Sequence, residues 1–337
     1  MSFRLRRLTD RLEEEESLSL SATRSAQTKG RSRPEAPDEF RTPFERDRDR
    51  VLHSKAFRRL KHKTQVFVNP EGDHYVTRLT HALQVTQVAR ALAAGLALNE
   101  TLTEAIALGH DVGHTPFGHT GEDALEGYFE QGWHHATQGV RIFEVLEDAN
   151  LTWEVRDGIR AHSWNVDPPP ATPEGELVRF ADRIAYLTHD ALDALRAGVI
   201  GGGDFPAPVT EALGEPGREW IDRLIRSLLT YSHATGAVGM EPDFLAVMGS
   251  LRDFMFERVY LSPGNQARKV AAVRVIRELV EFHLEHPEEI PASYRDNDAD
   301  RLTQVTDYVA GMTDRYALRT HDRFFRPVLF EEPTRSL

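Results

Sequence analysis

The feature that most constrains the fold of this chain is the stretch of residues 110–122, which reads HDVGHTPFGHTGE. It places three histidines, an aspartate and a glutamate directly after an apolar stretch at 103–109, whose spacing predicts a buried helix. Because a buried aspartate without a partner is costly, a bound metal ion that compensates its charge is favoured. Gly113, Pro116 and Gly118 interrupt a helix, which predicts a tight loop folded back over the site.

Two pairs of side chains in this stretch have the spacing of a metal-dependent catalytic site. His110 and Asp111 are adjacent, so they leave a helix about 100° apart and can both reach one ion over the helix end. Imidazole with carboxylate suits manganese, iron or zinc, and the carboxylate also admits magnesium. His119 and Glu122 are three residues apart, the spacing at which a carboxylate can orient an imidazole. Each histidine alone would be a structural residue, and it is their clustering that favours a site.

The composition limits both the chemistry and the location. The chain contains no cysteine, which excludes disulfides, thiolate metal sites and a cysteine nucleophile, so nitrogen and oxygen atoms must hold any metal. The longest apolar run, residues 89–98, includes Arg90 and is too short to span a bilayer. The N-terminus has no apolar signal segment. These features predict a soluble, cytoplasmic protein with no membrane contact.

The net charge of −12 is unevenly distributed along the chain. Residues 1–63 carry a balance of +6, which leaves −18 for the remainder. Most of the acidic excess is expected to form solvated helix faces. The basic N-terminal part could meet an anion, either a phosphate-bearing ligand or single-stranded nucleic acid.

Helical periodicity dominates the pattern, with neither an internal repeat nor a βαβ alternation, so we predict an all-α fold. A minor β-hairpin near residues 64–76 is the largest β element expected. The chain divides into a poorly ordered polar lead at 1–40, a core with the site at 41–200, and a helical part at 201–337 that completes one compact unit. Helices are predicted at residues 43–60, 78–92, 135–149, 155–162, 177–196, 219–230, 243–261, 266–286 and 300–318.

The predicted helix at 177–196 carries polar residues beside its apolar stripe. Asp182, Tyr186 and Asp190 follow each other at intervals of four residues and project over about 12 Å along one edge. The alternatives are that Tyr186 belongs to the core and that Asp190 is an ordinary surface charge. His81, on the helix at 78–92, would by itself be a structural histidine.

Taken together, His81, His110, Asp111 and Asp182 resemble the H…HD…D pattern of the HD superfamily of metal-dependent phosphohydrolases. The match extends further, because additional blocks resemble the deoxyguanosine triphosphate triphosphohydrolase family in the order of that family. These blocks are residues 46–50, 56–60, 63–67, 78–81, 109–122, 181–186 and 311–316.

This resemblance implies an all-α HD fold and the hydrolysis of a deoxynucleoside triphosphate to deoxynucleoside and tripolyphosphate. It implies one divalent ion, Mn²⁺ or Mg²⁺ foremost and otherwise Fe²⁺, Co²⁺ or Zn²⁺, held by His81, His110, Asp111 and Asp182. By position, the implied catalytic residues are His119, Glu122 and His135, and the implied substrate-binding residues are Gln65, Arg78, Arg183, Tyr186 and Asp190, with Arg58 as a further cation for the triphosphate. The resemblance also implies a homo-oligomer, commonly a hexamer.

The chain departs from the family at Ala136, where many members carry a polar residue, usually asparagine. It is also shorter than the dGTP-specific members and is similar to the shorter ones, whose substrate range is broader or regulated. Two alternatives to the triphosphohydrolase remain. One is another HD-domain hydrolase, a nucleoside monophosphatase or phosphodiesterase. The other is a regulatory module that binds single-stranded nucleic acid, which the acidic remainder of the chain would disfavour.

Overall fold

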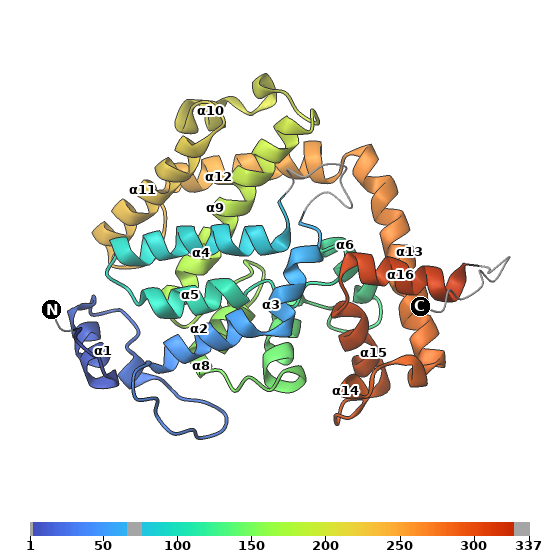
Figure 1. The fold of residues 1–337 in the computed structure, drawn as a ribbon. Helices are drawn as coiled ribbons and strands as arrows, with labels where there is room; N and C mark the ends of the chain where they lie inside the picture. Colours follow the sequence, from blue (N-terminus) through green and yellow to red (C-terminus); the bar gives the residue numbers. More distant parts are fainter. Residues whose placement is uncertain (1–2, 66–75, 327–337) are drawn as a thin grey trace.

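The computed structural model describes residues 3–65 and 76–326, and its secondary structure is helical throughout these ranges (Figure 1). The all-α prediction is therefore confirmed. The α-helices are α1 (Leu8–Glu14), α2 (Pro43–His53), α3 (Lys55–Arg59), α4 (Arg78–Gly95), α5 (Glu100–Gly109), α6 (His119–Glu126), α7 (His135–Arg141), α8 (Trp153–Ala161), α9 (Pro173–Arg196), α10 (Ala207–Leu213), α11 (Arg218–Thr235), α12 (Pro242–Met255), α13 (Pro263–Glu285), α14 (Ala292–Arg295), α15 (Arg301–Ala310) and α16 (Asp314–Phe325).

The main hydrophobic core is built around α4, α5 and α9, with α2 and α8 packed against α5. Val51, Leu92, Leu102, Ile159 and Leu177 are fully buried there, one from each of these helices. Helices α10 to α12 contribute to the same core. The residues that begin or end α4, α5 and α9 are thereby held at fixed positions relative to one another, which is the requirement for a site built from several helices.

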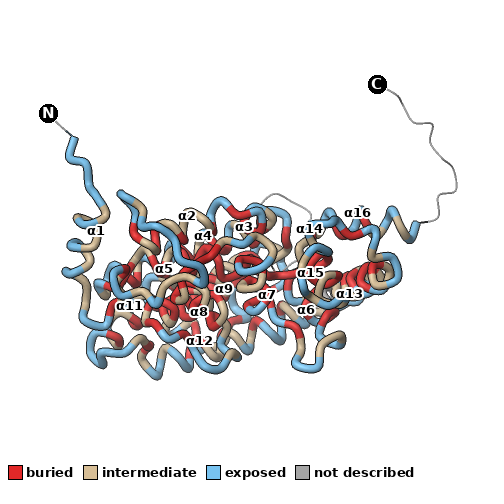
Figure 2. The backbone as a smooth tube through the Cα atoms, turned by 90° about the horizontal axis from the view of Figure 1, so that it is seen from below, coloured by how far each residue is buried: buried red, intermediate tan, exposed pale blue. Residues whose placement is uncertain are grey.

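A second, smaller core lies beside the first and is formed by α13, α15 and α16 against α6 (Figure 2). It includes Phe117 from the histidine-rich stretch. Lys63 is buried and donates to the backbone oxygens of His114 and, at 3.0 Å, of Ala310. The Asp314 carboxylate accepts hydrogen bonds from the backbone N–H groups of Thr64 and Phe117, each at 2.9 Å. The C-terminal helices therefore hold the histidine-bearing loop at residues 110–118 in place.

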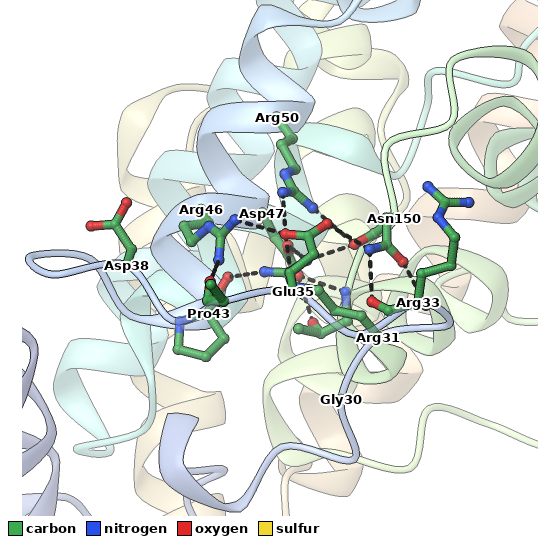
Figure 3. A network of polar contacts seen from close by, with 12 residues as sticks. Gly30, Arg31, Arg33, Glu35, Asp38, Pro43, Arg46, Asp47, Arg50 and Asn150 are labelled. Atoms are coloured by element: carbon green, nitrogen blue, oxygen red, sulfur yellow. Dashed lines mark hydrogen bonds and ion pairs between the residues drawn. The ribbon is translucent and has the colours of Figure 1, made fainter.

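The N-terminal segment makes specific contacts, although its composition predicts a poorly ordered lead. The Arg31 guanidinium donates to the fully buried carboxylate of Asp47 on α2 (Figure 3). Glu35 accepts from Arg46 at 2.7 Å and from Arg50 at 2.6 Å. Because these partners are side chains of α2, the charge-alternating block at 46–50 holds residues 31–35 against the helical core through hydrogen bonds and ion pairs. The domain boundaries at 40 and 200 remain proposals.

Several helix boundaries differ from the predicted ones, and side-chain caps explain two of them. The helix expected at 43–60 breaks at Ser54, whose hydroxyl caps the backbone N–H of Phe57 at 3.0 Å. The helix expected at 300–318 breaks into α15 and α16 where Thr313 caps Tyr316 at 3.3 Å. Helices α6, α10 and α14 were not predicted. For the expected hairpin, Thr64 and Thr77 form an isolated antiparallel bridge, and residues 66–75 lie outside the described residues.

Candidate active site and metal centre

The four candidate metal ligands come from three helical segments: donor atoms of His81, His110 and Asp182 lie within 4.8 Å of one another, and Asp111 lies beside His81 and His110. His81 lies on the first turn of α4, His110 and Asp111 follow the end of α5, and Asp182 lies on α9. His81 Nε2 is 3.0 Å from Asp182 Oδ1, and His110 Nε2 is 3.8 Å from the same oxygen. His110 Nε2 is also 3.4 Å from Asp111 Oδ1. Nitrogen and oxygen donors at this spacing are close enough to share one ion.

The donor atoms of this cluster fit a divalent cation. His110 Nδ1 lies 2.7 Å from the backbone oxygen of Ala107, an arrangement in which Nδ1 donates and Nε2 keeps its lone pair. This Nε2 atom is buried and has no hydrogen-bond partner among the described residues. Two imidazoles and two carboxylates bring two negative charges, which balance a divalent ion of the first transition row or Mg²⁺.

The electrostatic environment keeps both carboxylates ionised, as metal binding requires. Burial alone would raise the pKa of Asp111, but its neighbours His110 and the Arg78 guanidinium hold it well below its usual range. Burial likewise opposes ionisation of Asp182, and the hydrogen bond with His81 lowers the pKa of Asp182 to about 2. Both carboxylates are therefore already in the ionised form that binds a cation.

Arg78 is the buried counter-ion of Asp111. Its Nη1 donates to Asp111 Oδ2 at 2.8 Å, and the residue is only 1% exposed. Gly118 lies close by with a positive φ of 61°, and a Cβ at that position would stand 2.6 Å from Arg78 Nη2. The glycine thus makes room for the guanidinium while the loop turns into α6.

Glu122 is the centre of the candidate catalytic group. Its Oε2 atom accepts a hydrogen bond from His119 Nδ1 at 3.2 Å, and its Oε1 atom lies 2.6 Å from His135 Nδ1 and 3.1 Å from His114 Nδ1. Desolvation within the site tends to lower the pKa of His119, but the hydrogen bond and charge of Glu122 raise it by more, to above its ordinary value. The His119 side chain remains 72% exposed toward the open cavity. It is therefore both protonatable and accessible to a ligand.

The four residues of this catalytic group also lie close enough to bind an ion, but their ring geometry disfavours that function. The rings of His114 and His135 are stacked with centroids 3.8 Å apart and an angle of 12° between their planes. An imidazole nitrogen binds a metal along a lone pair that lies in the plane of the ring. Two nearly parallel planes do not converge on one ion, so the cluster of His81, His110, Asp111 and Asp182 is the better metal site.

A cavity of about 1040 Å³ opens over both groups and is large enough for a nucleotide. The candidate substrate residues Gln65, Arg78, Arg183, Tyr186 and Asp190 all line it. Arg58 does not line this cavity. It lies on α3, and its Nε donates to the backbone oxygen of Ser54 at 3.4 Å.

The sequence analysis missed several residues of this cavity. His162, at the end of α8, brings Nε2 to within 3.0 Å of His135 Nε2. Arg252 on α12, Tyr260 beyond it and Lys269 on α13 approach from the C-terminal half. Helical spacing marked the segments that carry these residues but could not identify which faces turn toward the site. Trp164, in the loop after α8, also lines the cavity.

Asp190 gives a testable pH dependence of stability. Burial raises the pKa of this carboxyl to about 8, although the Tyr260 hydroxyl donates to it at 2.8 Å and favours the ionised form. Between roughly pH 4 and pH 8 the folded state holds one more proton on this group than the unfolded state does. The free energy of unfolding therefore loses about 1.4 kcal/mol for each pH unit gained in this window.

In Asp190→Asn this contribution is absent, so the variant should gain stability relative to the wild type as the pH rises from about 5 to about 8. Urea unfolding of the metal-free proteins across this range measures the difference. Asp253→Asn, which alters a carboxylate whose side chain is 70% exposed, is the matched control and should follow the wild-type curve. Parallel curves for Asp190→Asn and the wild type would contradict a raised pKa.

The chain is similar to known proteins along most of its length. Residues 78–187 match the HD domain, and residues 238–323 match the phosphohydrolase-associated domain. A "deoxyguanosinetriphosphate triphosphohydrolase-like protein" of Caldanaerobacter subterraneus subsp. tengcongensis is 44% identical over 335 residues, covering 96% of each chain. A protein of the same name from Desulfatibacillum aliphaticivorans is 43% identical over 334 residues, covering 92% of this chain and 95% of its own.

Among solved structures, a hypothetical protein from Aquifex aeolicus matches 81% of this chain and 67% of its own, with a TM-score of 0.48 and 21% identity. Within the described residues, no helix has the length and apolarity needed to cross a membrane. The likeness to the two curated relatives extends over nearly the whole chain. The chain therefore belongs to the deoxyguanosinetriphosphate triphosphohydrolase-like family of HD-domain phosphohydrolases.

Proposed function

We propose that this protein hydrolyses deoxynucleoside triphosphates, dGTP and other dNTPs, to deoxynucleoside and tripolyphosphate in a metal-dependent reaction. The observation that carries the proposal is the position of His119, which is hydrogen-bonded to Glu122 and lines one cavity together with the ligands His81, Asp111 and Asp182. Arg183, Arg252 and Lys269 line the same cavity and give it cations for a polyphosphate. The names of the relatives support a nucleoside triphosphate as substrate.

The proposed reaction is attack of water on the α-phosphorus, with cleavage of the bond to the 5′-oxygen of the deoxynucleoside. A divalent ion held by the four ligands would supply Lewis-acid polarisation of the phosphoryl group and lower the pKa of water. The 5′-oxygen is a poor leaving group and needs a proton, for which His119 is the donor. Glu122 keeps the His119 imidazole oriented and favours its charged form.

Selection for the deoxyribose would come from close contact with the C2′ edge of the sugar. Gln65 lines the cavity with a buried Oε1 atom that has no partner among the described residues, which makes it an acceptor for a ligand. Tyr186 also lines the cavity, and the Tyr260 hydroxyl donates a hydrogen bond to Asp190. A ribose hydroxyl left without a partner in such a site carries a penalty of about 1–3 kcal/mol.

The proposed reaction is tested by stripping the protein of metal and supplying each deoxynucleoside triphosphate, or GTP, with and without Mn²⁺ or Mg²⁺. The expected products are deoxynucleoside and tripolyphosphate, formed only with metal. Release of nucleoside monophosphate or diphosphate would favour another HD-domain reaction. Absence of turnover, even with mixed nucleotides present, would count against the enzyme and direct attention to a binding module.

His119→Ala separates proton donation from metal binding. We expect kcat to fall by roughly 10²- to 10⁴-fold, because the leaving oxygen loses its proton donor. The metal content should stay at the wild-type level, since His119 is not one of the four clustered ligands. Elemental analysis of the dialysed variant beside its steady-state kinetics makes the comparison. Loss of metal together with activity would contradict the assigned role.

A further inference from the structure

Trp164 is held rigidly at the wall of the cavity. Its indole Nε1 donates to the backbone oxygen of Arg179 at 3.1 Å, and Arg179 in turn donates to the Trp164 backbone oxygen at 3.3 Å. The ring of Phe180 packs edge-on against it, with centroids 5.0 Å apart and planes at 85°. Trp164 nevertheless remains 36% exposed in the cavity lining. Three contacts thus fix the direction in which its ring faces.

The Arg183 guanidinium lies over the face of this ring. The carbon of its guanidinium group is 3.8 Å from the centroid of the Trp164 ring. Among the described residues Arg183 has no ion pair with a carboxylate, whereas Arg179 pairs with Glu176 at 3.2 Å. The Nε atom of Arg183 is buried and unpartnered. The guanidinium thus has the ring of Trp164 on one side and a contact with the Tyr186 hydroxyl, and its Nε–H is left for a further acceptor.

The chemistry of a stacked guanidinium identifies that acceptor. An aromatic ring attracts the face of the cation and does not use its N–H donors, which all lie in the guanidinium plane. Those donors match the oxygens of a phosphate group, which two parallel hydrogen bonds can engage. The lining of the cavity also holds Arg252 and Lys269 beside five aspartates, so the N–H donors of Arg183, and not the net charge of the lining, favour an anionic group as the ligand.

We propose that Trp164 is a positioning residue, which holds Arg183 by stacking so that the guanidinium presents its N–H edge to the polyphosphate of the substrate. This inference rests on the proposed function, because that function supplies the polyphosphate. Trp164 itself is not a catalytic residue. Its effect should therefore appear in the affinity for the polyphosphate more than in the rate of the chemical step.

The test measures the binding of inorganic tripolyphosphate, premixed with Mn²⁺, to the Mn²⁺-loaded protein by titration calorimetry. Trp164→Ala should weaken binding roughly 3- to 30-fold, the range expected from losing one cation–π contact. It should raise KM for the deoxynucleoside triphosphate by a similar factor while changing kcat less. Trp164→Phe restores an aromatic face and should recover most of the affinity.

Additional variants separate positioning from a general loss of structure. Arg183→Ala should lose at least as much affinity as Trp164→Ala, and the double variant should lose no more than Arg183→Ala alone. Arg183→Lys keeps the charge without the planar fork and should bind weakly. The matched control is Trp153→Ala, which removes a tryptophan stacked on Lys29 at 3.4 Å outside this cavity and should bind normally.

Wild-type affinity in Trp164→Ala, or independent losses that add in the double variant, would overturn the inference. So would a wild-type protein that does not bind tripolyphosphate. Because binding of this ion requires no turnover, failure of the proposed reaction is separately visible. Weakened binding in Trp164→Ala, with no release of deoxynucleoside by the wild type, would retain the positioning role and overturn the reaction.

Discussion

Replacing His110 by alanine is expected to remove the metal from the protein and to reduce kcat by about 10³-fold or more. The reason is the geometry of this side chain. Its Nδ1 atom is held at 2.7 Å from the Ala107 oxygen, and the buried, unpartnered Nε2 atom is left for the ion. Alanine removes one of the four donors, and the ion is lost with it. The carboxylates of Asp111 and Asp182 are then left without the positive charge of the ion that compensates them. Elemental analysis after dialysis, with the rate measured on the same sample, tests this expectation.

The matched control is His134→Ala, because His134 is exposed and lies outside the described cluster. This variant should retain its metal and most of its activity. Together with His119→Ala, it separates three outcomes: loss of metal, loss of the proton donor and loss of an unrelated histidine. A His110→Ala protein that keeps a full equivalent of metal would rule out the four-ligand site described here.

Replacing Gly113 by alanine should destabilise the fold by about 3–5 kcal/mol. A Cβ at this position would stand 2.0 Å from the backbone oxygen of His135 and 2.4 Å from the backbone nitrogen of Gly139. Both atoms belong to the backbone of α7, so no side-chain rotation can relieve the clash. The displacement would also move His135 away from Glu122, and we expect activity to fall along with stability.

The comparison variant is Gly249→Ala, in the interior of α12, where a Cβ meets nothing within 4 Å. Alanine there should stabilise the protein by roughly 0.5–1 kcal/mol, because it lowers the conformational entropy of the unfolded chain. Urea unfolding of the two variants and the wild type gives both differences. Equal stability of Gly113→Ala and the wild type would show that α7 does not approach the loop this closely.

Much of the candidate site could be predicted from the spacing of residues three or four apart on one helix. His119 and Glu122 are three residues apart on α6, and this spacing brings their side chains into a hydrogen bond. Asp182, Tyr186 and Asp190 lie at intervals of four on α9 and all reach the cavity. Which of these side chains share one face of a helix depends only on the pitch of that helix, so the periodicity of the sequence predicts it.

Other features depended on contacts between distant parts of the chain. The Arg78 side chain pairs with Asp111, thirty-three residues away, and is not free in the cavity. Arg58 stands in a block typical of the family but faces its own helix and not the cavity. A residue type at a given position does not reveal its partner, because the packing of helices decides which faces meet.

The sequence by itself determined the helical class of the protein, its family, and the residue types available for a metal and a proton donor. The absence of cysteine and the histidine-rich block at 110–122 already limited the chemistry. Only the tertiary structure decided that the C-terminal helices hold this block through Lys63 and Asp314, and that Trp164 covers the face of Arg183. The two kinds of feature differ in the separation along the sequence over which they act. Periodicity and capping act over a few residues, whereas these contacts join segments whose distance in sequence says nothing about their distance in the fold.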